Sequence, residues 1–272
     1  MPPPYKSIGR CIYCGKIPKD ISELTKEHII PHKLNGMFTI PNASCSCCQK
    51  IINKFETTCL RGFLLPARLH LKLRISKDSP KTIRLLLERN GVKQYERVGP
   101  ENFPLIYLPI FTGPLRLLSA PPCYHQILVT IMGIEFENAK EKWRSLNAEN
   151  IWTDKKADIC AFSRMLSKIA HCFAVMEVGL DHFKPLLIDE ILGYPTLYPN
   201  YYVGCSFVST ERMRSTRNFL HELSWYPVRI FGEIFVIVRV QLFSVLSAPA
   251  YDVVVGTMLN PDQGIGTSPL WG

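Results

Sequence analysis

The chain has no long uninterrupted apolar run. Its most apolar stretch, Ile234 to Tyr251, is broken by Arg239, Gln241 and Pro249. A membrane-spanning helix needs roughly 18 or more consecutive apolar residues, so the alternation in this stretch predicts a pair of strands instead. The first ten residues, MPPPYKSIGR, lack the apolar segment of a secretory signal peptide. We therefore expect a soluble, cytoplasmic protein that does not associate with a membrane.

The chain is also short of acidic residues and lacks internal repeats and low-complexity segments. It has 23 Asp and Glu against 32 Lys and Arg, which gives a net charge of +9. This excess permits binding to nucleic-acid phosphates, but many basic proteins bind no nucleic acid, so charge alone decides nothing. With 272 residues, 47% of them hydrophobic, the chain can form one large domain or two smaller ones.

Cysteine is the residue type whose placement is most informative. A CxxC at residues 11–14 is followed by ASCSCCQK at residues 43–50, which holds three more cysteines. In a reducing compartment, clustered cysteines indicate a metal site rather than disulfide bonds. In the second group only Cys45 and Cys48 have CxxC spacing, so Cys47 is expected to be a bystander. The predicted ligands of one tetrahedral structural zinc are Cys11, Cys14, Cys45 and Cys48.

Two other interpretations of the cysteines stay open. Buried free cysteines are common in protein cores, and a single CxxC is also a redox motif. Two CxxC pairs within 38 residues favour zinc, because a redox pair needs no second pair. The remaining cysteines lie among apolar residues and are expected in the core: Cys59, Cys123, Cys160, Cys172 and Cys205.

The loop between the CxxC pairs carries further chemical groups. It contains LTKEHIIPHKLNG at residues 24–36 and TIPNASC at residues 39–45, and the helix predicted next contains KFE at 54–56. In this order the motifs resemble the HNH endonucleases, in the subgroup stapled by a four-cysteine zinc. The resemblance covers about residues 11–56. It implies a ββα-metal active site that hydrolyses phosphodiester bonds.

The resemblance also implies roles for single residues. His28 matches the general base that deprotonates the attacking water, and a neutral imidazole suits that task near pH 7. Glu27 matches the residue that holds a catalytic divalent metal, Mg²⁺ or Mn²⁺, which neutralises charge on the phosphate. Asn42 matches the middle Asn of the motif, which holds the loop and helps to orient the histidine.

The helix predicted after Cys45 has one apolar and one polar side. Cys48, Ile51, Ile52, Phe55 and Cys59 share the side expected to be buried. Gln49, Asn53 and Glu56 share another, at i, i+4 and i+7. Many family members have Asn or His where this chain has Gln49, so Asn53 and Glu56 are the expected metal ligands. An ordinary solvated amphipathic helix would show the same spacing.

Basic residues near these motifs are expected to contact nucleic-acid phosphates. The candidates are Lys26, Lys33, Lys50 and Lys54. His32 either touches phosphate or is an ordinary surface histidine. Residues 68–75 alternate basic and aliphatic side chains, which predicts a half-buried strand. Its basic face (Arg68, His70, Lys72 and Arg74) either extends a DNA track or is simply solvated.

The rest of the chain predicts mixed secondary structure. Asn90-Gly91 within residues 82–98 indicates a β-hairpin. Further strands are expected at residues 104–111, 124–134, 200–208 and 226–255. Helices are expected at Asp158 to Val178, stopped by Gly179, and at residues 183–192. On the first of these, Arg164, Lys168 and His171 form a polar side that is expected to face solvent.

Together these patterns predict an α+β protein. Residues 1–62 are expected to form the small zinc-stapled ββα-metal module, and residues 63–272 a larger mixed α/β domain with antiparallel strands. The predicted function is that of a metal-dependent DNA endonuclease, with a role in defence against foreign DNA suggested by family analogy. The alternative is a zinc-stabilised nucleic-acid-binding or scaffold protein whose catalytic site has decayed. RNA, a homo-oligomer or a defence-system protein stay open as partners.

Overall fold

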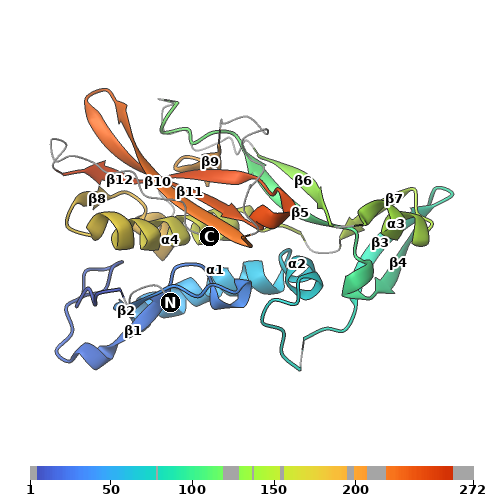
Figure 1. Ribbon diagram of the computed structural model, residues 1–272, viewed down its shortest axis with the longest axis horizontal. Coiled ribbons are helices and arrows are strands. Elements are labelled where there is room, and N and C mark those ends of the chain that lie inside the picture. Colours follow the sequence, from blue (N-terminus) through green and yellow to red (C-terminus); the bar gives the residue numbers. More distant parts are fainter. Residues whose placement is uncertain are drawn as a thin grey trace.

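The computed structural model describes residues 5–77, 79–118, 129–136, 138–153, 156–194, 199–206 and 219–259. Over these residues the protein is a mixed α/β fold whose sheets are antiparallel, as predicted (Figure 1). The N-terminal elements are β1 (Leu24–His28), β2 (Thr39–Cys45) and α1 (Ser46–Arg61). The two strands form a hairpin, and α1 follows the second strand directly. This is the ββα order that the sequence motifs imply.

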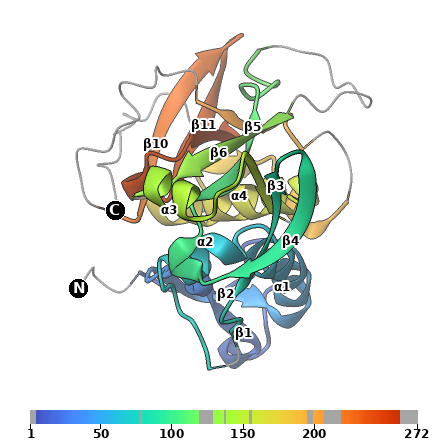
Figure 2. The same cartoon turned by 90° about the vertical axis from the view of Figure 1, so that its right-hand side faces the viewer.

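Helix α4 (Ile159–Ala174) is the central layer of the fold. It contacts α1 on one side and strands β11 and β12 on the other, so the order of layers is α1, α4, sheet (Figures 1 and 2). The predicted helix is confirmed: the Asp158 side chain accepts a hydrogen bond from the Ala161 N–H as an N-cap. A π-helical turn (Val175–Gly179) ends it at a glycine with φ of 94°.

The largest sheet covers α4. Its strands run in the order β10 (His221–Ile230), β11 (Glu233–Leu242), β12 (Ala250–Met258) and β8 (Phe183–Pro185), and β9 (Val203–Cys205) also pairs with β12. The strands expected within residues 226–255 are therefore present as a three-stranded meander. Residues 207–218, which include the end of the strand expected at 200–208, lie outside the described residues.

Two smaller sheets complete the structure. One has the order β4 (Val92–Val98), β3 (Ile83–Arg89), β7 (Asn150–Thr153), and the other pairs β5 (Leu105–Phe111) with β6 (Val129–Glu135). The predicted hairpin is confirmed, with Asn90 and Gly91 at φ of 50° and 73° in its turn. Short helices are α3 (Ala139–Ser145), α5 (Ile188–Leu192) and the turns Ile21–Glu23, His32–Leu34, Pro100–Asn102 and Ser244–Leu246.

The strand predicted at residues 68–75 is wrong. Residues Leu65–His70 form the short helix α2, which has Pro66 in its first turn, where proline is well tolerated. Lys72 and Arg74 then take positive φ, which no regular strand allows. Arg68 is buried and donates to the Leu60 carbonyl oxygen at 2.8 Å. The predicted basic face therefore does not exist.

The helix predicted at residues 183–192 is half wrong. Phe183–Pro185 is strand β8, and only Ile188–Leu192 is helical. Pro185 explains the difference, because a proline disfavours the helical conformation of the residue before it.

The N-terminal elements and the later ones share one buried apolar cluster, which includes Ile52 of α1, Phe162 of α4 and Val253 of β12. Histidines of the later elements add hydrogen bonds. His171 Nε2 lies 2.9 Å from the Ile12 carbonyl oxygen, and His221 Nε2 lies 2.7 Å from that of Leu34. Within the described residues, the helix Ile159–Gly179 is long and apolar enough to cross a membrane, but 78% of its most apolar segment is buried inside the fold, as in a core helix.

Candidate metal centre and catalytic cleft

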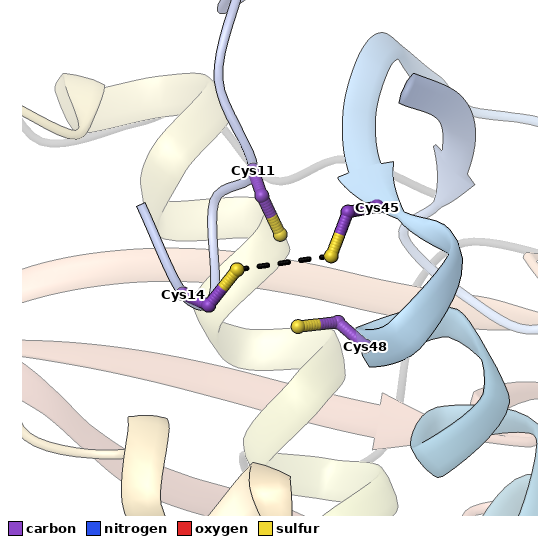
Figure 3. Close-up of side chains that lie close together, drawn as sticks. All are labelled: Cys11, Cys14, Cys45 and Cys48. Atoms are coloured by element: carbon purple, nitrogen blue, oxygen red, sulfur yellow. Dashed lines mark hydrogen bonds between the residues drawn. The ribbon is translucent and has the colours of Figure 1, made fainter. Parts of the chain in front are cut away.

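Four cysteine side chains converge at the start of α1 (Figure 3). Cys11 and Cys14 come from the N-terminal turn, Cys45 from the end of β2 and Cys48 from the first turn of α1. Their Sγ atoms all lie within 4.8 Å of one another, and those of Cys14 and Cys45 are 3.7 Å apart. Tetrahedral zinc with Zn–S bonds of ~2.3 Å separates its sulfurs by ~3.8 Å. The cluster is therefore compatible with a zinc site.

The pKa shifts of the cysteines in the cluster favour the binding of a cation. Burial opposes ionisation of Cys45, but hydrogen bonds from Cys48 and the other thiols lower its pKa to about 7. Burial and the neighbouring Cys11 raise the pKa of Cys48, because a second thiolate would repel the first. A bound metal ion removes this conflict, since thiolates are its ligands.

The other cysteines lie where predicted except for Cys160 and Cys205, and Cys205 is half-buried. Cys47 is exposed and outside the cluster, as a bystander should be. Cys59 and Cys172 are buried, but Cys160 is exposed because it lies in the first turn of α4, before the helix enters the core. Cys123 lies outside the described residues.

A cleft of about 270 Å³ lies beside α1, at the end of β1. Residues predicted to be functional form much of its lining: Lys26, Glu27, His28, Lys33, Asn53 and Glu56. Gln49, His32 and Lys168 also line it. The structure thus brings the general-base candidate, the metal-ligand candidates and two of the lysines into one cavity.

His28 is the last residue of β1 and is half-buried. Its Nδ1 atom is buried and has no hydrogen-bond partner among the described residues. Burial lowers the pKa of His28, and the neighbouring charge of His32 lowers it further. The two rings lie 5.1 Å apart, and His32 itself is exposed. A neutral ring with an unused nitrogen is equipped to accept a proton.

Asn42 lies on β2, in an irregularity of the hairpin rather than in the cleft. The β1–β2 register shifts between Thr25 and Glu27, and Asn42 takes φ of 48° there. Asparagine tolerates this left-handed conformation better than most residues.

Glu27 and Glu56 meet at the floor of the cleft, where they share a cation. The Lys168 Nζ atom is 2.9 Å from Glu27 Oε1 and 3.0 Å from Glu56 Oε1. It also donates to the backbone carbonyl oxygen of His28. The side chains of Lys168 and Glu27 are 1% and 2% exposed, so this ion pair is buried. Burial raises the pKa of Glu56, and Lys168 opposes that effect.

The sequence prediction that Lys168 and His171 face solvent is wrong. Both are fully buried in α4. Burial alone would lower the pKa of Lys168, but Glu27 and Glu56 outweigh it and raise that pKa above its usual value. The missed signal is the composition of the whole helix Ile159–Gly179, which is apolar enough over 18 residues to cross a membrane. A lysine in so apolar a helix is expected to be buried, and a buried lysine is paired.

Gln49 and Asn53 are joined to each other. Gln49 Nε2 donates to Asn53 Oδ1 at 3.4 Å, and Thr25 Oγ1 donates to Gln49 Oε1 at 3.4 Å. Gln49 therefore bridges β1 and α1 through its side chain. Asn53 is exposed at the cleft.

The lysine candidates divide into two groups. Lys26 and Lys33 are exposed and line the cleft, whereas Lys50 and Lys54 are exposed on α1 outside its lining. Burial lowers the pKa of Lys33, and the nearby charges of Arg61 and Arg68 add to that. Lys33 therefore lies close to other positive charges.

Comparison with models of known protein families, with curated proteins and with solved structures finds no match for this chain. The functional argument therefore rests on the arrangement of the residues.

Proposed function

We propose that the protein is an HNH-type endonuclease that hydrolyses phosphodiester bonds of DNA. The observation that carries the proposal is the placement of His28, which has a buried, unpartnered Nδ1, in a cleft rimmed by Lys26 and Lys33. The residue order and the ββα elements around this cleft support it. In this proposal, the imidazole of His28 takes a proton from water in the cleft while the lysines hold the phosphate.

Zinc has a structural role in the proposal. Cys45 and Cys48 flank the junction of β2 and α1, so a zinc bound to them and to the Cys11–Cys14 turn ties three segments together. The tie fixes the start of α1, and Asn53 and Glu56 lie further along the same helix. The metal is thus expected to hold the cleft in shape and to take no part in the reaction.

The residues expected to hold a second, catalytic metal do not fit that task. Glu27 and Glu56 already share the ammonium group of Lys168, and Asn53 accepts a hydrogen bond from Gln49. Among the described residues, the cysteine cluster is the group of three or more His, Cys, Asp or Glu ligands that converge within metal-binding distance. We therefore assign no step of the reaction to a divalent metal.

The same ion pairs favour a second candidate function. A protein that binds nucleic acid through Lys26 and Lys33 but does not cleave it needs no catalytic metal. This candidate best explains why Glu27 and Glu56 are already paired with Lys168.

The test compares the zinc-loaded wild type with His28→Ala on supercoiled plasmid DNA, with Mg²⁺, with Mn²⁺ and with neither. We expect the wild type to nick or linearise the plasmid and His28→Ala to be about 10²-fold slower or worse, since a general base contributes roughly that much. His182→Ala, a change at an exposed histidine outside the cleft, is the matched control and should cleave like the wild type.

Equal cleavage by the wild type and His28→Ala would show that another residue, or a contaminant, is responsible. A gel shift by both proteins without cleavage under any condition would refute the nuclease and support the binding protein. RNA as a second substrate in the same series identifies the preferred nucleic acid.

A further inference from the structure

We propose that Lys168 permanently takes the place of the divalent cation in the site formed by Glu27 and Glu56. The protein would then bind no Mg²⁺ or Mn²⁺ at these carboxylates, and a built-in ammonium group would supply the positive charge. The inference goes beyond the proposed endonuclease activity and does not depend on it, because it concerns the occupancy of the site.

The geometry leaves no room for both cations. The Lys168 Nζ atom lies 2.9 Å from Glu27 Oε1 and 3.0 Å from Glu56 Oε1, so it forms an ion pair with both carboxylates. Mg²⁺ needs several oxygens at ~2.0–2.1 Å in octahedral positions. A divalent ion bound between the same oxygens would lie against the ammonium group, with like charges in contact away from water.

Two backbone carbonyl oxygens also hold Lys168 in place. Its Nζ donates to the carbonyl oxygen of His28 and lies 3.5 Å from that of Ile29. Its side chain is 1% exposed, and α4 is packed between α1 and the large sheet. A metal that displaced the ammonium group would therefore break its contacts with two carboxylates and two carbonyl oxygens.

Two carboxylate oxygens make the proposal testable. Glu27 Oε2 and Glu56 Oε1 are buried and have no hydrogen-bond partner among the described residues, although Glu56 Oε1 lies 3.0 Å from Lys168 Nζ. If a cation binds here despite Lys168, Glu27 Oε2 is the oxygen that is free to receive it. Removing the charge of Glu27 therefore distinguishes a lysine-filled site from one that still takes metal.

The experiment measures binding of Mn²⁺ to the zinc-loaded protein by electron paramagnetic resonance, since the six-line signal of free Mn²⁺ disappears on binding. The variants are Lys168→Met, Glu27→Gln, the double variant of both, and Lys54→Met, a change at an exposed lysine on α1 that serves as matched control. We expect the wild type and Lys54→Met to leave Mn²⁺ free. Lys168→Met should bind one Mn²⁺ per chain at least ten-fold more tightly, and the double variant should lose that site.

One Mn²⁺ per chain on the wild type, lost in Glu27→Gln, would overturn the proposal. Failure of a folded Lys168→Met to gain a site would overturn it as well. Zinc content and circular dichroism establish that the variant is folded, and the wild-type and Glu27→Gln titrations decide the question even if it is not. Plasmid cleavage is not a readout here, so loss of the proposed activity leaves this result intact.

Discussion

Helix α1 contributes to two clusters of side chains that can carry negative charge, and the two clusters differ in how that charge is neutralised. Cys48, near its start, belongs to a group of four converging thiols. Within the described chain, the side-chain contact in this group joins two of its own thiols, Cys14 and Cys45. Glu56, eight residues and about 12 Å further on, belongs to two carboxylates that share Lys168. A group of anionic ligands thus indicates a metal only where the fold supplies no cation of its own. Predictions that break each cluster test this difference.

The largest effect is expected from Cys48→Ser. Structural zinc contributes roughly 10–16 kcal/mol in small zinc domains, which matches or exceeds the whole stability of a typical domain. Because the cluster shares its core with the later elements, we expect loss of zinc together with loss of the cooperative thermal transition. Elemental analysis and circular dichroism measure both.

Cys47→Ser is the control, since Cys47 is exposed and outside the cluster. It should retain one zinc per chain and melt like the wild type. A Cys48→Ser protein with full zinc content would refute the four-cysteine site.

A smaller but substantial effect is expected from Lys168→Met, in the absence of added metal. Removing one partner of a buried ion pair costs about 3–5 kcal/mol, because the remaining charge is left unpaired. Glu27→Gln should cost less, since Glu56 still pairs with Lys168 and the glutamine oxygen still accepts from it. Urea unfolding at pH 7 measures both free energies.

The decisive result is which variant, Lys168→Met or Glu27→Gln, loses more free energy of unfolding. A smaller loss for Lys168→Met than for Glu27→Gln would mean that Lys168 does not neutralise the carboxylates. Lys54→Met should change stability by no more than about 0.5 kcal/mol, as expected for an exposed site.

The buried histidines are the opposite case to Lys168, because their side chains are neutral whereas that of Lys168 is charged. The Phe243 N–H donates to His221 Nδ1, so a neutral ring must donate through Nε2 to Leu34. Burial lowers the pKa of His221 to about 4. An unfolded chain has a histidine pKa of ~6.5. Above that value neither state is protonated, and between the two values only the unfolded state takes up a proton.

The free energy of unfolding should therefore fall as pH decreases from about 6.5 to 4, by up to about 3 kcal/mol for this residue. His221→Gln keeps a donor for Leu34 but does not titrate. Urea unfolding of both proteins across this range should give a shallower decline for the variant, by about one proton. Parallel curves would refute a buried neutral His221.

The N-terminal region was largely predictable because its information is local. The spacing of the CxxC pairs placed four thiols correctly, and the period of α1 placed Ile52 and Phe55 on its buried side. The β-hairpin at Asn90-Gly91 and the capped start of α4 at Asp158 were predictable for the same reason: the turn and the cap depend on neighbouring residues.

The chemistry around Glu27 was less predictable because its partner is remote. Period alone placed Lys168 on a polar side of α4, but helical period cannot show which neighbours cover that side. The strand expected at residues 68–75 failed similarly: its alternation was real, but Pro66 and the positive φ of Lys72 and Arg74 overrode it. Local pattern predicts elements, whereas tertiary contacts decide which charges meet.

The separation of Lys168 and His28 along the chain also determines which of the two sites can form first during translation. Lys168 follows His28 by 140 positions. A ribosome that adds about 5–20 residues per second needs roughly 7–28 s to make that segment. The four cysteines are complete as soon as residue 48 has been made. A metal bound by these cysteines would thus close the nascent chain early, whereas the cleft that holds His28 receives Lys168 only after most of the protein has been translated.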